Sequence, residues 1–113
     1  MNRGIRKSEL FIADFDRQFR WYERVAGWEV AKRYLDAVDT TLKRLTELPD
    51  LGRLRHFPQP ELQGLRSLVL ARPFHHHVVF YRNKETDIEA WRLMHGARDM
   101  PRRLLERPGF ETD

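Results

Sequence analysis

Two successive amphipathic helices constrain the fold of this chain more than any other sequence feature. Apolar residues recur every three or four positions through 9–26 and again through 29–48, which places them on one face of each helix. They are Phe11, Phe15, Phe19, Tyr22 and Ala26 in the first helix, and Val30, Tyr34, Val38, Leu42, Leu45 and Leu48 in the second. Pro49 ends the second helix, because proline cannot continue the hydrogen-bond ladder. The pattern predicts an antiparallel helical hairpin with a tight connection at Gly27 and Trp28.

After these helices the periodicity changes from helical to alternating. Residues 53–65 are interrupted by Pro58, Pro60 and Gly64, a composition that predicts a loop. Three segments rich in valine, leucine and aromatic residues come next. They predict short antiparallel strands over 65–71, 76–82 and 88–95.

The two ends of the chain complete the expected fold. Residues 1–8 favour a first strand over a loose arm, and residues 100–106 favour a short last helix with Pro101 in its first turn. The helical hairpin must bury its apolar stripe, and the strands offer the sheet face on which to do so. We therefore expect the α+β class, with an N-terminal helical hairpin on a small antiparallel sheet. At 113 residues, the whole of 1–113 is expected to form a single domain.

The composition limits the compartment and the partners. The chain has no cysteine, and its sequence holds neither a run of apolar residues of membrane-spanning length nor a secretory signal, so we expect a cytoplasmic protein without disulfides. Basic residues outnumber acidic ones by 21 to 17, and most of them are arginines. Arginine suits phosphate and carboxylate recognition, which makes a nucleic acid or an acidic protein surface a plausible partner; solvated arginines explain the same composition without any partner.

The stretch RPFHHHVVFYR, residues 72–82, raises the question of a metal site. Strand alternation places Phe74, His76, Val78 and Phe80 on one face and His75, His77, Val79 and Tyr81 on the other. The three histidines therefore cannot converge on one ion. Only His56 and His95 remain as further nitrogen ligands, and no cysteine is present. We predict no metal and interpret the triplet as histidines at the start of a strand, some exposed and some packed.

Four motifs follow one another in an order that resembles a known family. They are PDLGRLR (49–55), PELQGLRSLVL (60–70), RPFHHHVVFYR (72–82) and AWRLMHGARDMPRRLL (90–105). Together with DFDRQFRWYE in the first helix, they resemble the RelE/ParE superfamily of toxins from type II toxin-antitoxin systems. The chain is most similar to the ParE branch, whose members are also called plasmid stabilisation proteins. The resemblance covers nearly the whole chain and implies the same helical hairpin on a small sheet.

The resemblance implies two alternative activities. ParE-like toxins are associated with poisoning DNA gyrase and have no established chemistry, whereas RelE-like toxins cut mRNA on the ribosome. This chain has no lysine within 53–83, no tyrosine after Tyr81 and no histidine–tyrosine pair at its end, all of which depart from the nucleases. We therefore favour inhibition of growth by binding gyrase over an mRNA endoribonuclease. A third alternative is a degenerate module that binds only its antitoxin or a nucleic acid.

The family also implies partners and cofactors. A cognate antitoxin would neutralise the toxin, and the chain would reach operator DNA only through the complex with that antitoxin. The partners expected besides the antitoxin are gyrase or, in the alternative, the ribosome and mRNA. No cofactor and no membrane are expected.

Candidate residues for these activities lie at both ends of the chain. Target binding is predicted for Arg98, Arg102 and Arg103, in a cationic segment that follows the sheet, where a mobile tail can project. An acidic amphipathic antitoxin segment is predicted to bind the helical hairpin and the sheet edge. The hairpin residues expected to contact it are Arg17, Trp21, Arg24 and Trp28.

RNA cleavage would need a different set of residues. Arg66 and Arg98 would stabilise the phosphorane, and His95, His77 or Glu61 would transfer the protons. Each of the main candidates has a structural alternative: Arg66 pairs with an acidic residue of the helices, His95 bonds the local backbone, and Arg98 stabilises a turn.

Overall fold

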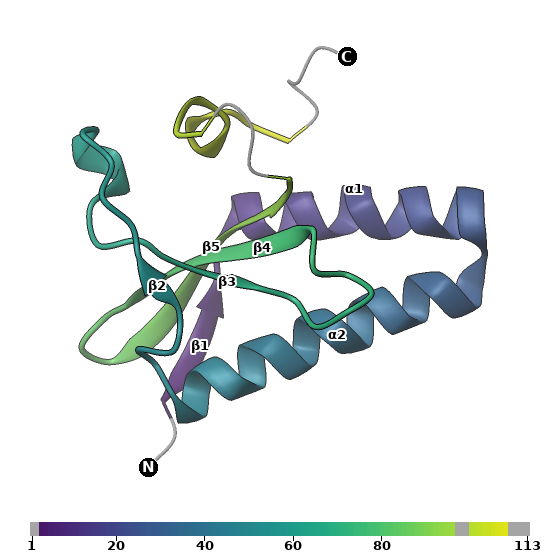
Figure 1. Ribbon diagram of the computed structural model, residues 1–113, viewed down its shortest axis with the longest axis horizontal. Helices are drawn as coiled ribbons and strands as arrows, with labels where there is room; N and C mark the ends of the chain where they lie inside the picture. The colour runs from purple at the N-terminus through teal and green to yellow at the C-terminus, as the bar shows by residue number, and fades with distance from the viewer. Residues whose placement is uncertain (1–2, 97–99, 109–113) are drawn as a thin grey trace.

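The computed structural model describes residues 3–96 and 100–108 and has the predicted α+β class (Figure 1). Its elements follow in the order β1 (Gly4–Lys7), α1 (Glu9–Ala26), α2 (Trp28–Glu47), β2 (Arg53–Leu54), η1 (Pro60–Leu62), β3 (Arg66–Val69), β4 (His77–Asn83), β5 (Asp87–His95) and η2 (Arg102–Leu105). The labels η1 and η2 denote short 3-10 helices. The second of them lies where the sequence predicts a short last helix.

Both long helices form where the apolar spacing predicts them. The hydroxyl of Ser8 accepts a hydrogen bond from the amide of Phe11 at 3.0 Å and so caps α1. Gly27 alone separates α1 from α2, and its φ of 92° lies in the left-handed region that favours glycine. Trp28, predicted to belong to the connection, is instead the first residue of α2. Within the described residues, no helix is long and apolar enough to cross a membrane.

The sheet has the strand order β1-β5-β4-β3-β2. Strands β3, β4 and β5 form the predicted antiparallel meander, and β1 joins β5 in parallel, which confirms the strand within residues 1–8. The prediction of a loop over 53–65 is wrong at Arg53–Leu54, which pair with β3 as β2. Two residues are too few to produce an alternating pattern that could be recognised in a sequence.

Apolar side chains cover both faces of the sheet. The helical hairpin packs on one face, around a core that includes Phe11, Tyr34, Val38, Leu42, Leu45, Val79, Tyr81, Ile88, Ala90 and Leu93. The segment between β2 and β3 and the C-terminal η2 pack on the other face, around Leu62, Leu65, Phe80, Met94 and Leu104. Figure 1 shows η2 above the sheet, next to the upper end of β5. The sheet is therefore the middle layer between the hairpin and two irregular segments.

A β-bulge in β5 determines which side chains face the helices. Phe80 of β4 pairs with Arg92, but Tyr81 pairs with Ala90, so Trp91 is the extra residue. Strict alternation would place Ala90 and Arg92 on the same face. Because of the bulge, Leu93 instead joins Ala90 in the core under the helices, and Met94 joins the opposite core. The bulge thus turns the end of β5 so that Leu93 faces α1.

The first two histidines of the triplet precede β4, and His77 is its first residue. The amide of Phe74 donates to the carbonyl of Ala71 and the amide of His77 donates to that of Phe74, each at 3.0 Å, so the chain turns twice before β4 begins. Phe74 consequently packs in the core with Val79, on the face that His77 also occupies. The prediction that Phe74 and His77 lie on opposite faces is wrong for this reason. From His77 onwards the predicted alternation is confirmed.

Candidate functional site

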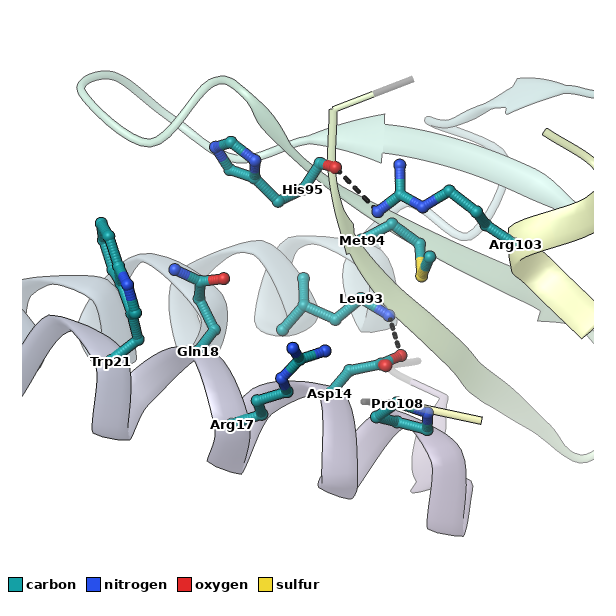
Figure 2. Close-up of a pocket in the computed structure, with 9 residues that line it drawn as sticks. All are labelled: Asp14, Arg17, Gln18, Trp21, Leu93, Met94, His95, Arg103 and Pro108. Carbon is teal, nitrogen blue, oxygen red and sulfur yellow. Dashed lines mark hydrogen bonds between the residues drawn. The ribbon is translucent and has the colours of Figure 1, made fainter. Parts of the chain in front are cut away.

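A surface cleft of about 300 Å³ lies where α1, the end of β5 and the C-terminal segment meet (Figure 2). It is lined by Asp14, Arg17, Gln18, Trp21, Leu93, Met94, His95, Arg103 and Pro108. Successive turns of α1 form one wall, the last residues of β5 form the floor, and η2 with the residues after it forms the other wall. Three segments that are distant in the sequence therefore build one site.

The wall from α1 combines a cation, an amide and an indole. Arg17 and Gln18 are neighbours on one turn of the helix and Trp21 lies one turn further on; Figure 2 shows all three beside the cleft. The side chain of Trp21 is 46% exposed, although its ring also packs edge-on against Tyr22 at 5.3 Å. A large exposed aromatic surface next to an arginine is typical of protein-binding sites.

The lining residue Asp14 forms a buried ion pair with Arg92, which lies behind the cleft surface. The guanidinium of Arg92 donates to both carboxylate oxygens of Asp14, from Nε at 2.8 Å and from Nη2 at 2.9 Å. The amide of Leu93 donates to the same carboxylate at 2.9 Å. Arg92 is 0% exposed, so both groups have lost water and depend on each other and on nearby backbone groups. The carboxylate of Asp14 is thus a structural anchor between α1 and β5.

The C-terminal wall is bound to the sheet through both backbone and side chain. Nη2 of Arg103 donates to the carbonyl of His95 at 3.0 Å, which holds its guanidinium at the edge of the cleft (Figure 2). Leu104 is fully buried in the core on the far face of the sheet. The predicted mobile tail is therefore wrong for residues 102–105, which pack against the sheet because Leu104 supplies an apolar anchor.

The histidines differ sharply in their surroundings. His77 is 2% exposed, and its Nε2 lies 2.8 Å from the hydroxyl of Tyr22, within hydrogen-bond distance. Burial, followed by the nearby His95 and His76, lowers the pKa of His77 to about 4. His95 is exposed, with its ring 4.7 Å from that of His77, and its pKa is lowered by partial burial and then by His76 and Arg103. At neutral pH burial thus keeps His77 uncharged in the core.

Comparison with known proteins identifies the family of this chain. The family model for the ParE toxin of the type II toxin-antitoxin system parDE matches residues 5–100. The chain belongs to the ParE toxin family. A chain of the chromosomal ParDE TA system from P. aeruginosa has the same fold, at a TM-score of 0.68 and 22% identity over 84% of this chain and 97% of that one. No curated protein matches the sequence. The resemblance inferred from the four motifs is confirmed.

In this ParE toxin, the residues predicted to bind an antitoxin extend along the hairpin. Arg17 and Trp21 line the cleft. Arg24 is exposed in the last turn of α1, and Trp28 at the start of α2 is 57% exposed, with its ring edge-on to Phe19 at 6.1 Å. Trp28 lines a second hollow with Glu29, Lys32, Arg33 and Asp36 rather than the cleft, and the role of all four residues remains a prediction.

The residues predicted for target binding are only partly described. Arg103 lines the cleft, whereas Arg102 is exposed on η2 and forms an ion pair with Glu106. Arg98 lies outside the described residues.

The structure separates the residues predicted for RNA cleavage. Arg66 pairs with Tyr81 at one end of the β3–β4 ladder, and His95 pairs with His77, four positions earlier along β4. At about 3.3 Å per residue this is an offset of about 13 Å along β4, and because β3 and β5 flank β4 on opposite sides, two strand spacings of about 4.8 Å bring the backbone separation to roughly 16 Å. Glu61 is exposed in η1, on a different segment. His77 and His95 lie together, with ring centroids 4.7 Å apart, but Arg66 and Glu61 lie elsewhere, so the described candidates do not all meet in one site.

Arg66 has a clear structural role. Its Nη1 donates to the carbonyl of Gly52 at 2.9 Å and its Nη2 lies 3.5 Å from the carboxylate of Asp50, both in the turn after α2. The expected acidic partner thus follows the helix rather than belonging to it. Tyr81 stabilises the same turn, because its hydroxyl donates to the carbonyl of Pro49 and accepts from the amide of Gly52, each at 2.8 Å.

Two residues of this region, the lining residue Asp14 and its buried partner Arg92, were not selected from the sequence. A signal for Arg92 was present, because a charged residue in the middle of the apolar stretch IEAWRLMH must find a partner if the strand is buried. The identity of that partner had no signal, since Asp14 lies 78 positions away on a helix with several other acidic residues.

Proposed function

We propose that this ParE toxin inhibits bacterial growth by binding a cellular target, DNA gyrase, and that a cognate antitoxin neutralises it in the cytoplasm. The cleft carries the proposal. It places the cations Arg17 and Arg103 on its two side walls and an exposed indole between them and the hairpin tip. Such a surface complements an acidic, partly apolar protein segment and needs no proton transfer.

The arrangement of the titratable groups favours binding over RNA cleavage. Cleavage needs a base, an acid and a cation at one scissile phosphate. Of the described candidates for these roles, His77 is buried, Arg66 stabilises a turn, and Glu61 is on another segment. The lining carboxylate of Asp14 is engaged by Arg92. His95 alone among those candidates borders the cleft.

Expression of the chain in bacteria without an antitoxin tests the target. DNA synthesis and protein synthesis are followed separately by incorporation of labelled thymidine and methionine. We expect DNA synthesis to stop first. Arg103→Ala should weaken growth inhibition about tenfold, the effect of losing roughly 1.4 kcal/mol from one charge-assisted contact. Lys43→Ala, an exposed cation on α2, is the matched control and should have no effect.

The same experiment separates binding from nuclease activity. His95→Gln keeps a hydrogen-bonding side chain of similar size but cannot titrate, so a binding toxin should retain most of its growth inhibition. Loss of inhibition in a folded His95→Gln chain, together with cutting of ribosome-bound mRNA by the unmodified chain, would establish the endonuclease instead.

Antitoxin binding to the hairpin is tested with the neutralising partner encoded beside the toxin. Hydrogen exchange of the complex should show protection within residues 9–48, and Trp21→Ala with Trp28→Ala should weaken the complex, because two exposed indoles lose their contacts. Protection confined to the residues after 100 would contradict this assignment.

A further inference from the structure

Arg92 connects the two walls of the cleft. Its Nε and Nη2 donate to Asp14 on α1, while its Nη1 donates to three carbonyls of the C-terminal segment. These are the carbonyls of Arg103 at 3.1 Å, of Leu104 at 2.9 Å and of Glu106. One fully buried guanidinium therefore links helix α1 to the segment that carries Arg103.

We propose that Arg92 and Asp14 form a clamp that holds residues 102–108 as a wall of the cleft, so that both are positioning residues for the partner-binding surface. They act through Arg103, whose guanidinium faces the cleft only while its backbone is held. The effect on growth rests on the proposed function. The effect on the C-terminal segment does not.

The C-terminal segment needs such a clamp. A four-residue 3-10 helix is not stable by itself, and its last carbonyls have no partner within the helix. The two N–H bonds of Nη1 are shared among three carbonyls of this segment, so one of them is bifurcated, while Nε and Nη2 remain on Asp14. Its charge would be costly to bury alone, and Asp14 neutralises it. Leu104 adds apolar burial, which is non-directional, whereas the hydrogen bonds from Arg92 fix the carbonyls in direction.

A second arginine in the neighbouring strand supplies the matched control. Arg82 of β4 pairs with Glu89 at 3.2 Å and donates to the carbonyls of Gln63, at 2.9 Å, and of Glu61, which belong to η1 and its C-terminal end. It thus clamps a 3-10 helix with the same chemistry. Neither η1 nor Arg82 lines the cleft.

The test compares Arg92→Lys with Arg82→Lys. An ammonium group can keep an ion pair with the carboxylate, but it cannot also reach the carbonyls on the opposite side. Amide hydrogen exchange then reports each segment: Leu104 and Glu106 donate within η2, and Leu62 and Gln63 donate within η1. Growth inhibition is measured in parallel.

We expect Arg92→Lys to speed exchange at Leu104 and Glu106 by at least about tenfold, as expected when a charge-assisted hydrogen bond no longer opposes local opening, while α1 keeps its protection. Growth inhibition should fall by a similar factor. Arg82→Lys should speed exchange at Leu62 and Gln63 and leave growth inhibition unchanged.

Other results would overturn the clamp. Unchanged exchange at Leu104 and Glu106, or an equal loss of growth inhibition in both variants, would show that Arg92 contributes only to the overall stability of the fold and does not position the C-terminal segment. If Arg92→Lys does not fold, exchange is measured on the unmodified chain instead. The amides of Leu104 and Glu106 should then exchange at least about 100-fold more slowly than in an unstructured peptide, and equal rates would refute the clamp. A folded chain without growth inhibition would refute the proposed function, while the exchange data would still judge the clamp.

Discussion

Acid should destabilise this toxin through His77. The side chain is 2% exposed and lies among the rings of Tyr22, Tyr34 and Phe74, with Tyr22 also within hydrogen-bond distance. Burial in this aromatic core is the main reason why the pKa of His77 is lowered from 6.5 to about 4. Between these two pKa values, His77 is therefore neutral in the native state but protonated in the unfolded chain.

The sign and the size of the effect follow from linkage. Between pH 6.5 and about 4, the unfolded chain binds a proton at His77 that the native chain does not bind, so the free energy of unfolding falls as the pH falls. Each pKa unit corresponds to about 1.4 kcal/mol, so the loss is about 3 kcal/mol at pH 4 and is complete, at roughly 3–4 kcal/mol, only below pH 4. Between pH 7.5 and pH 5, the loss from His77 should be about 2 kcal/mol.

Urea unfolding, followed by tryptophan fluorescence at pH 7.5 and pH 5, measures this loss. His77→Gln can still hydrogen bond to Tyr22 but has no proton to gain, so its stability should depend less on pH by about 2 kcal/mol. His75 and His95 also have lowered pKa values, but they remain in both chains and cancel in the comparison. Equal pH dependence of the two chains, within about 0.5 kcal/mol, would refute the reasoning.

Two further outcomes are expected. Tyr81→Phe should lower the free energy of unfolding by about 2–4 kcal/mol, because it leaves the carbonyl of Pro49 and the buried amide of Gly52 without their hydroxyl partner. Chemical denaturation measures this change, and a loss below about 0.5 kcal/mol would show that water replaces the hydroxyl. Protein purified without an affinity tag should contain no stoichiometric metal by elemental analysis, and one zinc or nickel per chain that disappears on replacing His75 and His77 would contradict this.

The secondary structure was largely predictable because it depends on local spacing. The apolar stripes of the two helices, Gly27 between them and Pro49 after them are short-range signals, and each matches a feature of the structure. The meander was equally predictable, since segments rich in valine, leucine and aromatic residues are separated by turn residues. The family followed from the order of four such motifs.

The site was less predictable because it depends on pairings over long distances. Arg17, Trp21, His95 and Arg103 were all selected from the sequence, but for different activities, and only the tertiary structure brings them to one cleft. Arg66 was selected for RNA cleavage, but its guanidinium binds the turn after α2. Only the tertiary structure shows this, because it places that turn beside β3.

The sequence by itself determined the helical hairpin, the meander and the family, because hydrophobic periodicity is encoded within a few residues. Only the tertiary structure decided which side chains at the end of β5 face the helices and which group neutralises Arg92. The extra residue at Trp91 reverses the alternation for Leu93 and leaves Arg92 between Asp14 and the C-terminal carbonyls. A bulge depends on the register between two strands, and a buried charge is neutralised by whichever group the fold brings to it.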